Sequence, residues 1–262
     1  MPRTEWTELP SSVRTAVTAR IGPVTAATPV ADGLTCAIAA VLTAEDGRVF
    51  VKGVPVSDTQ GVAAQDWEGA VNARVAGIAP LLLARITVDG WDLLVFEHIE
   101  GRHADLSPGS PDVALVADAL HATQELTADG LAPRLADRFA GHLDDAQTLL
   151  LAGDALLHTD TNPHNLLITP GRAHLVDWAM VAAGPAWVDV AYVTVRLMEA
   201  GWPGAEALGW AGRFPSWRDA DPVAVAAFVD GTCRMGEATV GAAGAGPSNS
   251  RFRQLLANAP VA

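Results

Sequence analysis

The pattern of hydrophobic and polar positions in the first hundred residues predicts short strands and two helices. Apolar residues at helical spacing predict helices over residues 11–21 and 60–76. Apolar runs bounded by turn residues at 45–48 and 89–90 predict strands over residues 35–43, 49–52, 81–88 and 91–96. Strands joined by such short turns form an antiparallel sheet. We therefore expect an antiparallel sheet in this half of the chain.

The rest of the chain reads as mainly helical, with one short hairpin. Helical spacing predicts helices over residues 110–126, 133–151, 187–199 and 221–240. Apolar runs over residues 166–168 and 174–176 flank a turn at 169–171, which predicts a β-hairpin. Residues 202–217 read as rich in loops, and the Gly-, Ala- and Ser-rich residues 242–249 read as a flexible connection. The fold class expected from the whole pattern is α+β.

Three oxygen-bearing side chains stand at one end of this hairpin. Asp160 and Asn165 precede it, and Asp177 follows its second strand. In kinase-type phosphoryl transfer, an Asp orients the acceptor hydroxyl, and an Asn and a later Asp in this order hold magnesium. Asp and Asn are also common in plain turns, but a turn explains one or two of these residues and not the ordered set. The pattern predicts Asp160 as the catalytic residue and Asn165 and Asp177 as Mg²⁺ ligands.

The segment around these residues resembles the aminoglycoside phosphotransferase and choline kinase family, a small-molecule branch of the protein-kinase-like fold. The family pattern is His-Gly-Asp, four residues, Asn, and then Ile-Asp-Trp. This chain has His158, Thr159 in place of the glycine, Asp160, Asn165, and then Val176-Asp177-Trp178. The resemblance implies two lobes. We expect a nucleotide-binding lobe over residues 1–97 and a catalytic and substrate-binding lobe over residues 98–262.

Lys52 is the candidate residue for binding the nucleotide phosphates. It ends an apolar strand, where a lysine can reach the α- and β-phosphates, and Glu68 in the next predicted helix is its expected partner. The alternative is an exposed lysine at a strand end. Thr35, close to Gly33, is a candidate for a loop that covers the phosphates, although the full glycine-rich pattern is absent and an ordinary turn is the alternative.

The resemblance implies roles for two further places in the sequence. Residues 94–101 are similar to the family's hinge between the lobes, which implies that the backbone of Glu97 and Ile99 binds the purine of ATP or GTP. Asp189, in the first turn of a predicted helix, is implied to brace the catalytic loop through hydrogen bonds. That role is structural rather than chemical.

The resemblance implies a kinase that transfers the γ-phosphoryl group of ATP or GTP to a hydroxyl of an aminoglycoside or nucleoside antibiotic. A metabolic sugar or choline-type kinase and a regulatory pseudokinase are alternatives, and a metal-dependent hydrolase is a third. Candidates for lining the acceptor site are tryptophans and aspartates late in the chain. They are Trp202, Trp210, Trp217, Asp219, Asp221 and Asp230.

Charge and composition limit the partners. The chain has 17 basic and 30 acidic residues, a formal net charge of −13, which argues against nucleic acid and is compatible with a cationic small molecule. The alternative is that the negative charge only keeps the protein in solution. No uncharged apolar run approaches a membrane span, and no signal peptide is evident at the start of the sequence. We therefore expect a cytoplasmic protein, a monomer or a weak dimer.

Overall fold

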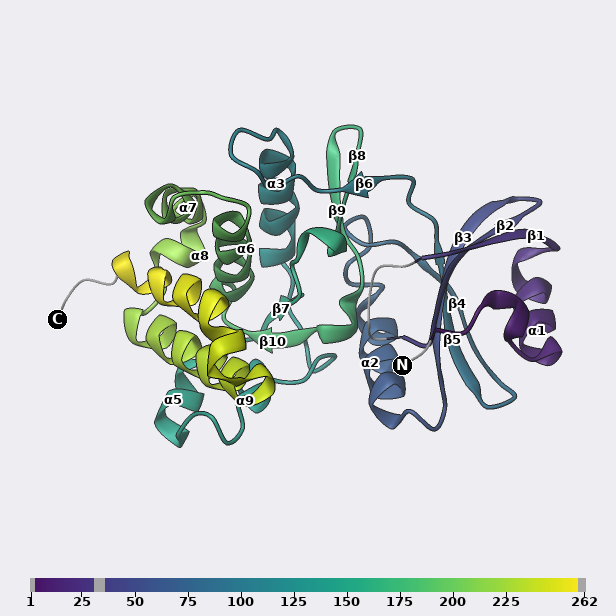
Figure 1. The fold of residues 1–262 in the computed structure, drawn as a ribbon, viewed down its shortest axis with the longest axis horizontal. Helices are drawn as coiled ribbons and strands as arrows, with labels where there is room; N and C mark the ends of the chain where they lie inside the picture. Colours follow the sequence, from purple (N-terminus) through teal and green to yellow (C-terminus); the bar gives the residue numbers. More distant parts are fainter. Residues whose placement is uncertain (1–2, 31–35, 259–262) are drawn as a thin grey trace.

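A five-stranded antiparallel sheet forms the N-terminal part of the molecule (Figure 1). The computed structural model describes residues 3–30 and 36–258. The strand order is β1-β2-β3-β5-β4. The strands are β1 (Val24–Pro29), β2 (Ile38–Ala44), β3 (Gly47–Pro55), β4 (Leu82–Val88) and β5 (Trp91–Glu97). The predicted strands are thus present, and β3 continues three residues beyond Lys52.

The two faces of this sheet carry different helices. The helix α1 (Ser11–Ile21) packs Val13 and Val17 against strand residues such as Val51 and Val95. Because side chains alternate along a strand, Lys52 points to the opposite face, where α2 (Thr59–Val71) lies. Alternation along β3 therefore places the lysine between the sheet and α2.

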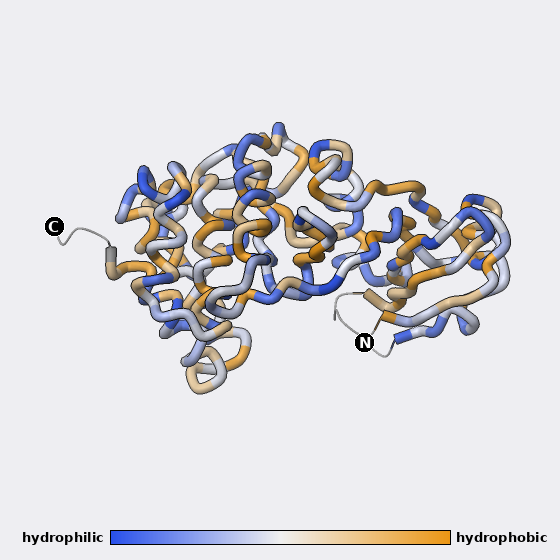
Figure 2. The backbone as a smooth tube through the Cα atoms, turned by 90° about the horizontal axis from the view of Figure 1, so that it is seen from above, coloured by the Kyte–Doolittle hydropathy of each residue, from blue (hydrophilic) through white to orange (hydrophobic). Residues whose placement is uncertain are grey.

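Helices surround a second core in the C-terminal part (Figures 1 and 2). The α-helices are α3 (Asp112–Gln124), α4 (Leu135–Arg138), α5 (Asp145–Leu150), α6 (Trp187–Glu199), α7 (Gly204–Ala211), α8 (Pro215–Arg218) and α9 (Pro222–Gln254). The short 3-10 helices of this part are η2 (Pro163–Asn165), η3 (Trp178–Met180) and η4 (Leu255–Asn258), and η1 (Trp6–Glu8) lies in the N-terminal part. Aromatic rings meet edge to face in this core, with Phe228 in contact with Trp187, Tyr192 and Phe252.

Two small sheets carry the segments that were expected to hold the site. The strands β6 (Arg102–His103), β8 (Leu166–Thr169) and β9 (Arg172–Leu175) form one sheet in the order β6-β8-β9. The strands β7 (Ala155–Leu157) and β10 (Ala182–Gly184) form the other. The expected hairpin is β8–β9, in which Leu166 pairs with Leu175. The boundary between the lobes at residue 97, the last residue of β5, stays a prediction.

Three sequence-based expectations about the C-terminal part are wrong. The helix expected over residues 133–151 is two short helices, because Gly141 has φ +78° and Asp144 caps a new helix at Asp145. Residues 202–217 are largely helical, as α7 and α8. The second error has a simple cause, because Pro203, Gly204 and Pro215 resemble loop signals but stand at the starts of α7 and α8.

The third error concerns residues 242–249, which are helical and not a flexible connection. Gly241, with φ +75° and ψ 161°, interrupts the helical backbone of α9, and the helix resumes after it. Asn249 is buried, and its Nδ2 donates to Cys233 O at 3.1 Å and to Glu237 Oε1 at 2.9 Å. The second half of α9 therefore packs back against the first.

None of the helices in the described part of the chain combines the length and the apolar character needed to cross a bilayer.

Candidate active site

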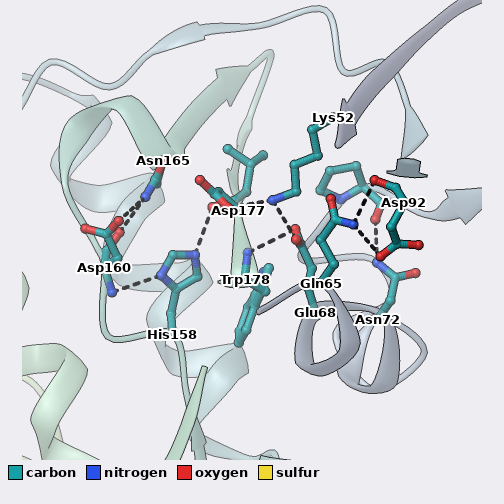
Figure 3. Close-up of polar contacts among 12 residues, drawn as sticks. Lys52, Gln65, Glu68, Asn72, Asp92, His158, Asp160, Asn165, Asp177 and Trp178 are labelled. Carbon is teal, nitrogen blue, oxygen red and sulfur yellow. Dashed lines mark hydrogen bonds and ion pairs between the residues drawn. The ribbon is translucent and has the colours of Figure 1, made fainter. Parts of the chain in front are cut away.

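A buried ammonium group lies between two carboxylates where the sheet, α2 and the hairpin meet (Figure 3). Lys52 Nζ is 2.5 Å from Glu68 Oε2 and 2.6 Å from Asp177 Oδ1. Only 7% of the Lys52 side chain and 4% of the Glu68 side chain are exposed. Lys52 is also the only lysine in the 262-residue sequence. The structure thus brings together the lysine and glutamate that the sequence paired.

The electrostatics of this cluster follow from burial and from the opposed charges. Burial disfavours the charged Lys52, but Asp177 and Glu68 outweigh it and raise its pKa above the usual range. Burial acts to raise the pKa of Asp177, but the Lys52 ammonium holds that pKa below its usual range. For Glu68 burial prevails, and its pKa is raised despite Lys52. Lys52 and Asp177 are therefore the firmly ionised pair of the cluster.

The helix that carries Glu68 is fixed to the sheet at two points (Figure 3). Gln65 Nε2 donates to Asp92 Oδ2 at 2.7 Å on β5. One turn beyond Glu68, Asn72 donates to Pro80 O and accepts from Leu82 N, both at 2.8 Å. Because these bonds lie on either side of Glu68, they hold its carboxylate toward Lys52.

A buried aspartate holds the loop that leads to Asp160. Asp189, near the start of α6, accepts from His158 N at 2.7 Å and from Thr159 N at 2.8 Å. His158 Nε2 bonds to Val176 O at 2.9 Å, and His158 Nδ1 accepts from Asp160 N at 3.2 Å. These two bonds fit only the neutral tautomer protonated at Nε2. Asp189 braces the loop, as expected.

Two amides orient the carboxylate of Asp160. Asn162 Nδ2 donates to Asp160 Oδ1 at 2.9 Å, and Asn165 Nδ2 donates to Asp160 Oδ2 at 2.9 Å. The bond from Asn162 was not expected from the sequence. Polar side chains two residues apart often bond to each other locally, so the spacing of Asp160 and Asn162 was the signal in the sequence for this bond.

Asn165 and Asp177 flank the hairpin in the sequence and lie at the same end of it in space. Asn165 O accepts from Val176 N at 2.9 Å, which places Asn165 beside the residue before Asp177. Asp177 itself has φ +63° and ψ +66°, a left-handed backbone that aspartate tolerates better than most residues. Hairpin pairing thus brings both predicted metal ligands to the same place.

The donor atoms here fit a magnesium ion. The Asn165 nitrogen faces Asp160, so Asn165 Oδ1 is the atom that would bind the ion, and Asp177 has a second carboxylate oxygen, Oδ2, besides the Oδ1 that contacts Lys52. Within residues 3–30 and 36–258, no group of three or more His, Cys, Asp or Glu side chains is placed to hold a metal. A site of this kind is completed by substrate phosphates and water, as is usual for Mg²⁺.

One of the backbone groups expected to bind the purine at the hinge has another partner. Glu97 N donates to Leu81 O at 2.9 Å, and the Glu97 carboxylate accepts from Leu81 N at 3.0 Å. The N–H of Glu97 is therefore engaged with Leu81, and purine binding through the Glu97 carbonyl and the backbone of Ile99 stays a prediction. Thr35 lies outside the described residues.

The aromatic and acidic residues suggested for the acceptor site have other contacts. Trp210 is buried against Phe214, and Trp202 Nε1 donates to Leu106 O at 2.8 Å. Asp221 caps α9, and Asp230 pairs with Arg234 at 2.8 Å. These contacts give the four residues structural roles, and the expectation that they line an acceptor site stays a prediction.

Comparisons with known proteins agree with this arrangement. The chain is similar to a choline kinase structure from Streptococcus pneumoniae, with 12% identity, a TM-score of 0.60 and coverage of 93% of this chain and 99% of that one. An aminoglycoside-3'-phosphotransferase of type VIII has 20% identity, a TM-score of 0.54 and coverage of 93% and 96%. A fructosamine-3-kinase structure from Haemophilus somnus has 10% identity, a TM-score of 0.61 and coverage of 96% and 98%.

At these identities the structures establish the two-lobed protein-kinase-like fold. No curated protein sequence matches the chain significantly. The model of the phosphotransferase enzyme family matches residues 19–224, well over half of the sequence. The matched range includes Lys52, Glu68, Asp160, Asn165 and Asp177. The chain therefore belongs to the phosphotransferase enzyme family.

Proposed function

We propose that the protein transfers the γ-phosphoryl group of ATP or GTP to a hydroxyl of an antibiotic-like small molecule, such as an aminoglycoside or a nucleoside antibiotic. The observation that carries the proposal is the buried contact of Lys52 with Glu68 and Asp177, beside an Asp160 oriented by two amides. A phosphate-binding cation and an acceptor-binding carboxylate are the two groups that phosphoryl transfer needs in fixed positions.

Each residue has a distinct part in this proposal. Lys52 binds the α- and β-phosphates, with Glu68 fixing its ammonium, and the Glu97 carbonyl and the Ile99 N–H bind the purine. Asn165 and Asp177 hold Mg²⁺, which neutralises charge on the phosphates when bound. Thr35 is proposed to lie in the loop over the phosphates.

Asp160 orients the acceptor and takes its proton. The acceptor oxygen forms a bond to the γ-phosphorus while the bond from that phosphorus to the β–γ bridging oxygen breaks. The hydroxyl proton passes to Asp160, and ADP or GDP leaves with the electron pair of the broken bond. Because the transition state is loose, the proton moves late and positioning provides most of the catalysis.

The acceptor class rests on charge and on the range of similar proteins. A net charge of −13 is compatible with a cationic acceptor. The similar structures carry the names of choline, aminoglycoside and fructosamine kinases, so a metabolic kinase of sugars or choline-like alcohols is the second candidate. We propose a cytoplasmic protein that acts as a monomer or a weak dimer, with its lobes divided at residue 97.

The proposal is tested first by nucleotide binding. Calorimetry with MgATP and MgGTP should show binding to the wild type and a large loss in Asp177→Ala. Binding that needs neither magnesium nor Asp177 would contradict the assigned metal site.

Turnover is tested next, by ADP or GDP release against a panel of aminoglycosides, nucleoside antibiotics, choline, ethanolamine and simple sugars. Asp160→Asn should abolish release and largely spare nucleotide binding. Release with choline or sugars alone would favour the metabolic kinase. Nucleotide binding with no release for any acceptor would favour a pseudokinase.

A further inference from the structure

Thr159 has an unusual backbone conformation for its residue type. Its φ is +60°, in the left-handed region that β-branched residues rarely adopt. The family pattern has glycine at this place, and glycine adopts such a conformation without strain. A threonine here needs surrounding contacts that hold it, and such strain is often found at functional sites.

The Thr159 side chain has these contacts. Arg138 Nη1 donates to Thr159 Oγ1 at 2.7 Å, and Arg138 Nη2 donates to Met180 O at 2.8 Å. Thr159 Oγ1 also donates to Met180 O. The three groups form a closed ring, which we name the Thr159 clamp: Arg138, Thr159 and Met180.

The clamp acts on both parts of the candidate site. Thr159 immediately precedes Asp160, so its ψ angle sets the direction in which Asp160 leaves the loop. Met180 follows Asp177 by three residues in the sequence, so the same ring ties the Asp177 segment to the Asp160 loop. Asp189 fixes the backbone N–H of Thr159 but does not touch its side chain in the described contacts. The Thr159 side chain is therefore held by Arg138 and Met180 of the clamp.

Arg138 is well placed to be the fixed member of the ring. It ends the short helix α4, and both Leu135 at the start of this helix and Phe139 directly after it are fully buried in the core. Its planar guanidinium presents two parallel donors, which a lysine ammonium cannot do in the same way.

We propose that Arg138 is a positioning residue, which holds Thr159 in the left-handed conformation and so directs the Asp160 carboxylate toward the acceptor hydroxyl. This inference rests on the proposed phosphoryl transfer. It predicts a larger defect in turnover than in nucleotide binding, because Thr159 of the clamp is bonded directly to Asp160, whereas Lys52 and its two carboxylates contact one another.

The first test compares Arg138→Ala and Arg138→Lys with Arg134→Ala. Arg134 precedes the same helix, but its exposed side chain pairs with Asp137. Arg138→Ala should lower kcat about 100-fold, as a misplaced catalytic group does, and change the nucleotide Kd less than about threefold. Lysine should not restore kcat, millimolar guanidinium should restore part of it in Arg138→Ala, and Arg134→Ala should behave as wild type.

A second readout does not depend on turnover. Amide hydrogen exchange at Thr159 and Asp160 should become at least about tenfold faster in Arg138→Ala and stay unchanged in Arg134→Ala, because the loop opens locally when the clamp is lost. In a Thr159→Gly background, adding Arg138→Ala should lower kcat less than about threefold, because the two changes remove the same interaction.

The outcomes separate this inference from the proposed function. Unchanged kcat in Arg138→Ala would overturn it, as would parallel losses of nucleotide binding, melting temperature and kcat without guanidinium rescue. A wild type that releases no ADP or GDP with any acceptor would reject the proposed function instead. In that case unchanged exchange at Thr159 and Asp160 in Arg138→Ala would still overturn the clamp, and faster exchange would support it.

Discussion

Lys52 and Asp177 are in contact at 2.6 Å, although 125 residues separate them in the sequence. The contact joins the central strand of the N-terminal sheet to the end of the hairpin in the other lobe. Glu68 holds the same ammonium from α2, so a single cation links three elements. The group that we propose to bind the nucleotide phosphates is therefore held by contacts from both lobes.

Removing this cation should affect both stability and activity. In Lys52→Met, Glu68 and Asp177 remain as two largely buried carboxylates without a counter-charge, so the free energy of unfolding should fall by about 2–3 kcal/mol. Nucleotide affinity and turnover should fall as well, by about 10-fold or more for affinity. Urea unfolding and calorimetry measure the two effects.

The double variant Lys52→Met/Glu68→Gln is the matched control. It removes one of the unpaired charges, so part of the lost stability should return while nucleotide affinity and turnover stay low. Equal stability of the single variant and the wild type would contradict the view that the cation compensates buried charge.

The buried Asp92 should give the protein a defined acid sensitivity. Burial acts to raise the pKa of Asp92, but hydrogen bonds from Arg85, Thr87 and Gln65 outweigh it and hold that pKa below its usual range. The unfolded chain therefore takes up a proton at Asp92 near pH 3.9, about the value for a free aspartate, before the folded protein does. The stabilisation is complete above this pH and is lost as the pH falls through the lowered pKa.

Asp92→Asn measures this contribution directly. At neutral pH it should cost about 3 kcal/mol of unfolding free energy, since it leaves Arg85 without its buried partner. The difference between wild type and variant should shrink as the pH is lowered below about 4. Urea unfolding across a pH series tests this, and a difference that stays constant or grows toward acid pH would contradict it.

Two glycines should respond in opposite ways to alanine. A Cβ on Gly53, next to Lys52, would lie 2.7 Å from Asp92 O and 2.9 Å from the Leu93 side chain. Gly53→Ala should therefore destabilise the fold by about 1–3 kcal/mol and weaken nucleotide binding by displacing β3.

Gly209 in α7 provides the control, because a Cβ there meets nothing within 4 Å. Gly209→Ala should stabilise the protein by about 0.5–1 kcal/mol through helix propensity. Thermal unfolding compares the two variants, and a neutral Gly53→Ala would show that the strand yields at this position.

Asn249 should be important for the folded end of α9. Asn249→Ala removes the bonds to Cys233 O and Glu237 and should cost about 1–3 kcal/mol, because a buried side chain loses two hydrogen bonds. The nearby exposed Ser250→Ala should change stability by less than about 0.5 kcal/mol. Proteolysis over residues 242–254 provides a second measurement, and equal resistance in both variants would show that Asn249 is dispensable.

The sequence was most informative where chemistry restricts the choice of residue. The order of Asp160, Asn165 and Asp177 around a short hairpin predicted their convergence correctly, because hairpin pairing fixes which ends meet. The strand position of Lys52 and the helix position of Glu68 were sufficient to pair them. Both inferences used local spacing, together with an ordered set of side chains that a simple turn does not require.

Long-range packing and helix boundaries could be predicted less well from the sequence. Arg138 has no motif around it, and its contact with Thr159 depends on where α4 is placed by Leu135 and Phe139 in the core. The helix after Gly241 was read as flexible because its composition is rich in Gly and Ala. Its order comes from burial of Asn249 and Phe252, which tertiary contacts decide and composition does not.

The presence of a single lysine has a practical consequence for the chemical modification of this protein. Every other basic side chain of fixed charge is an arginine, so a reagent or enzyme that modifies lysine amines has one side-chain target. That target is buried and protonated, so its acylation would require the sheet and the hairpin to separate. The extent of acylation at this position would then count the molecules in which the two lobes have come apart.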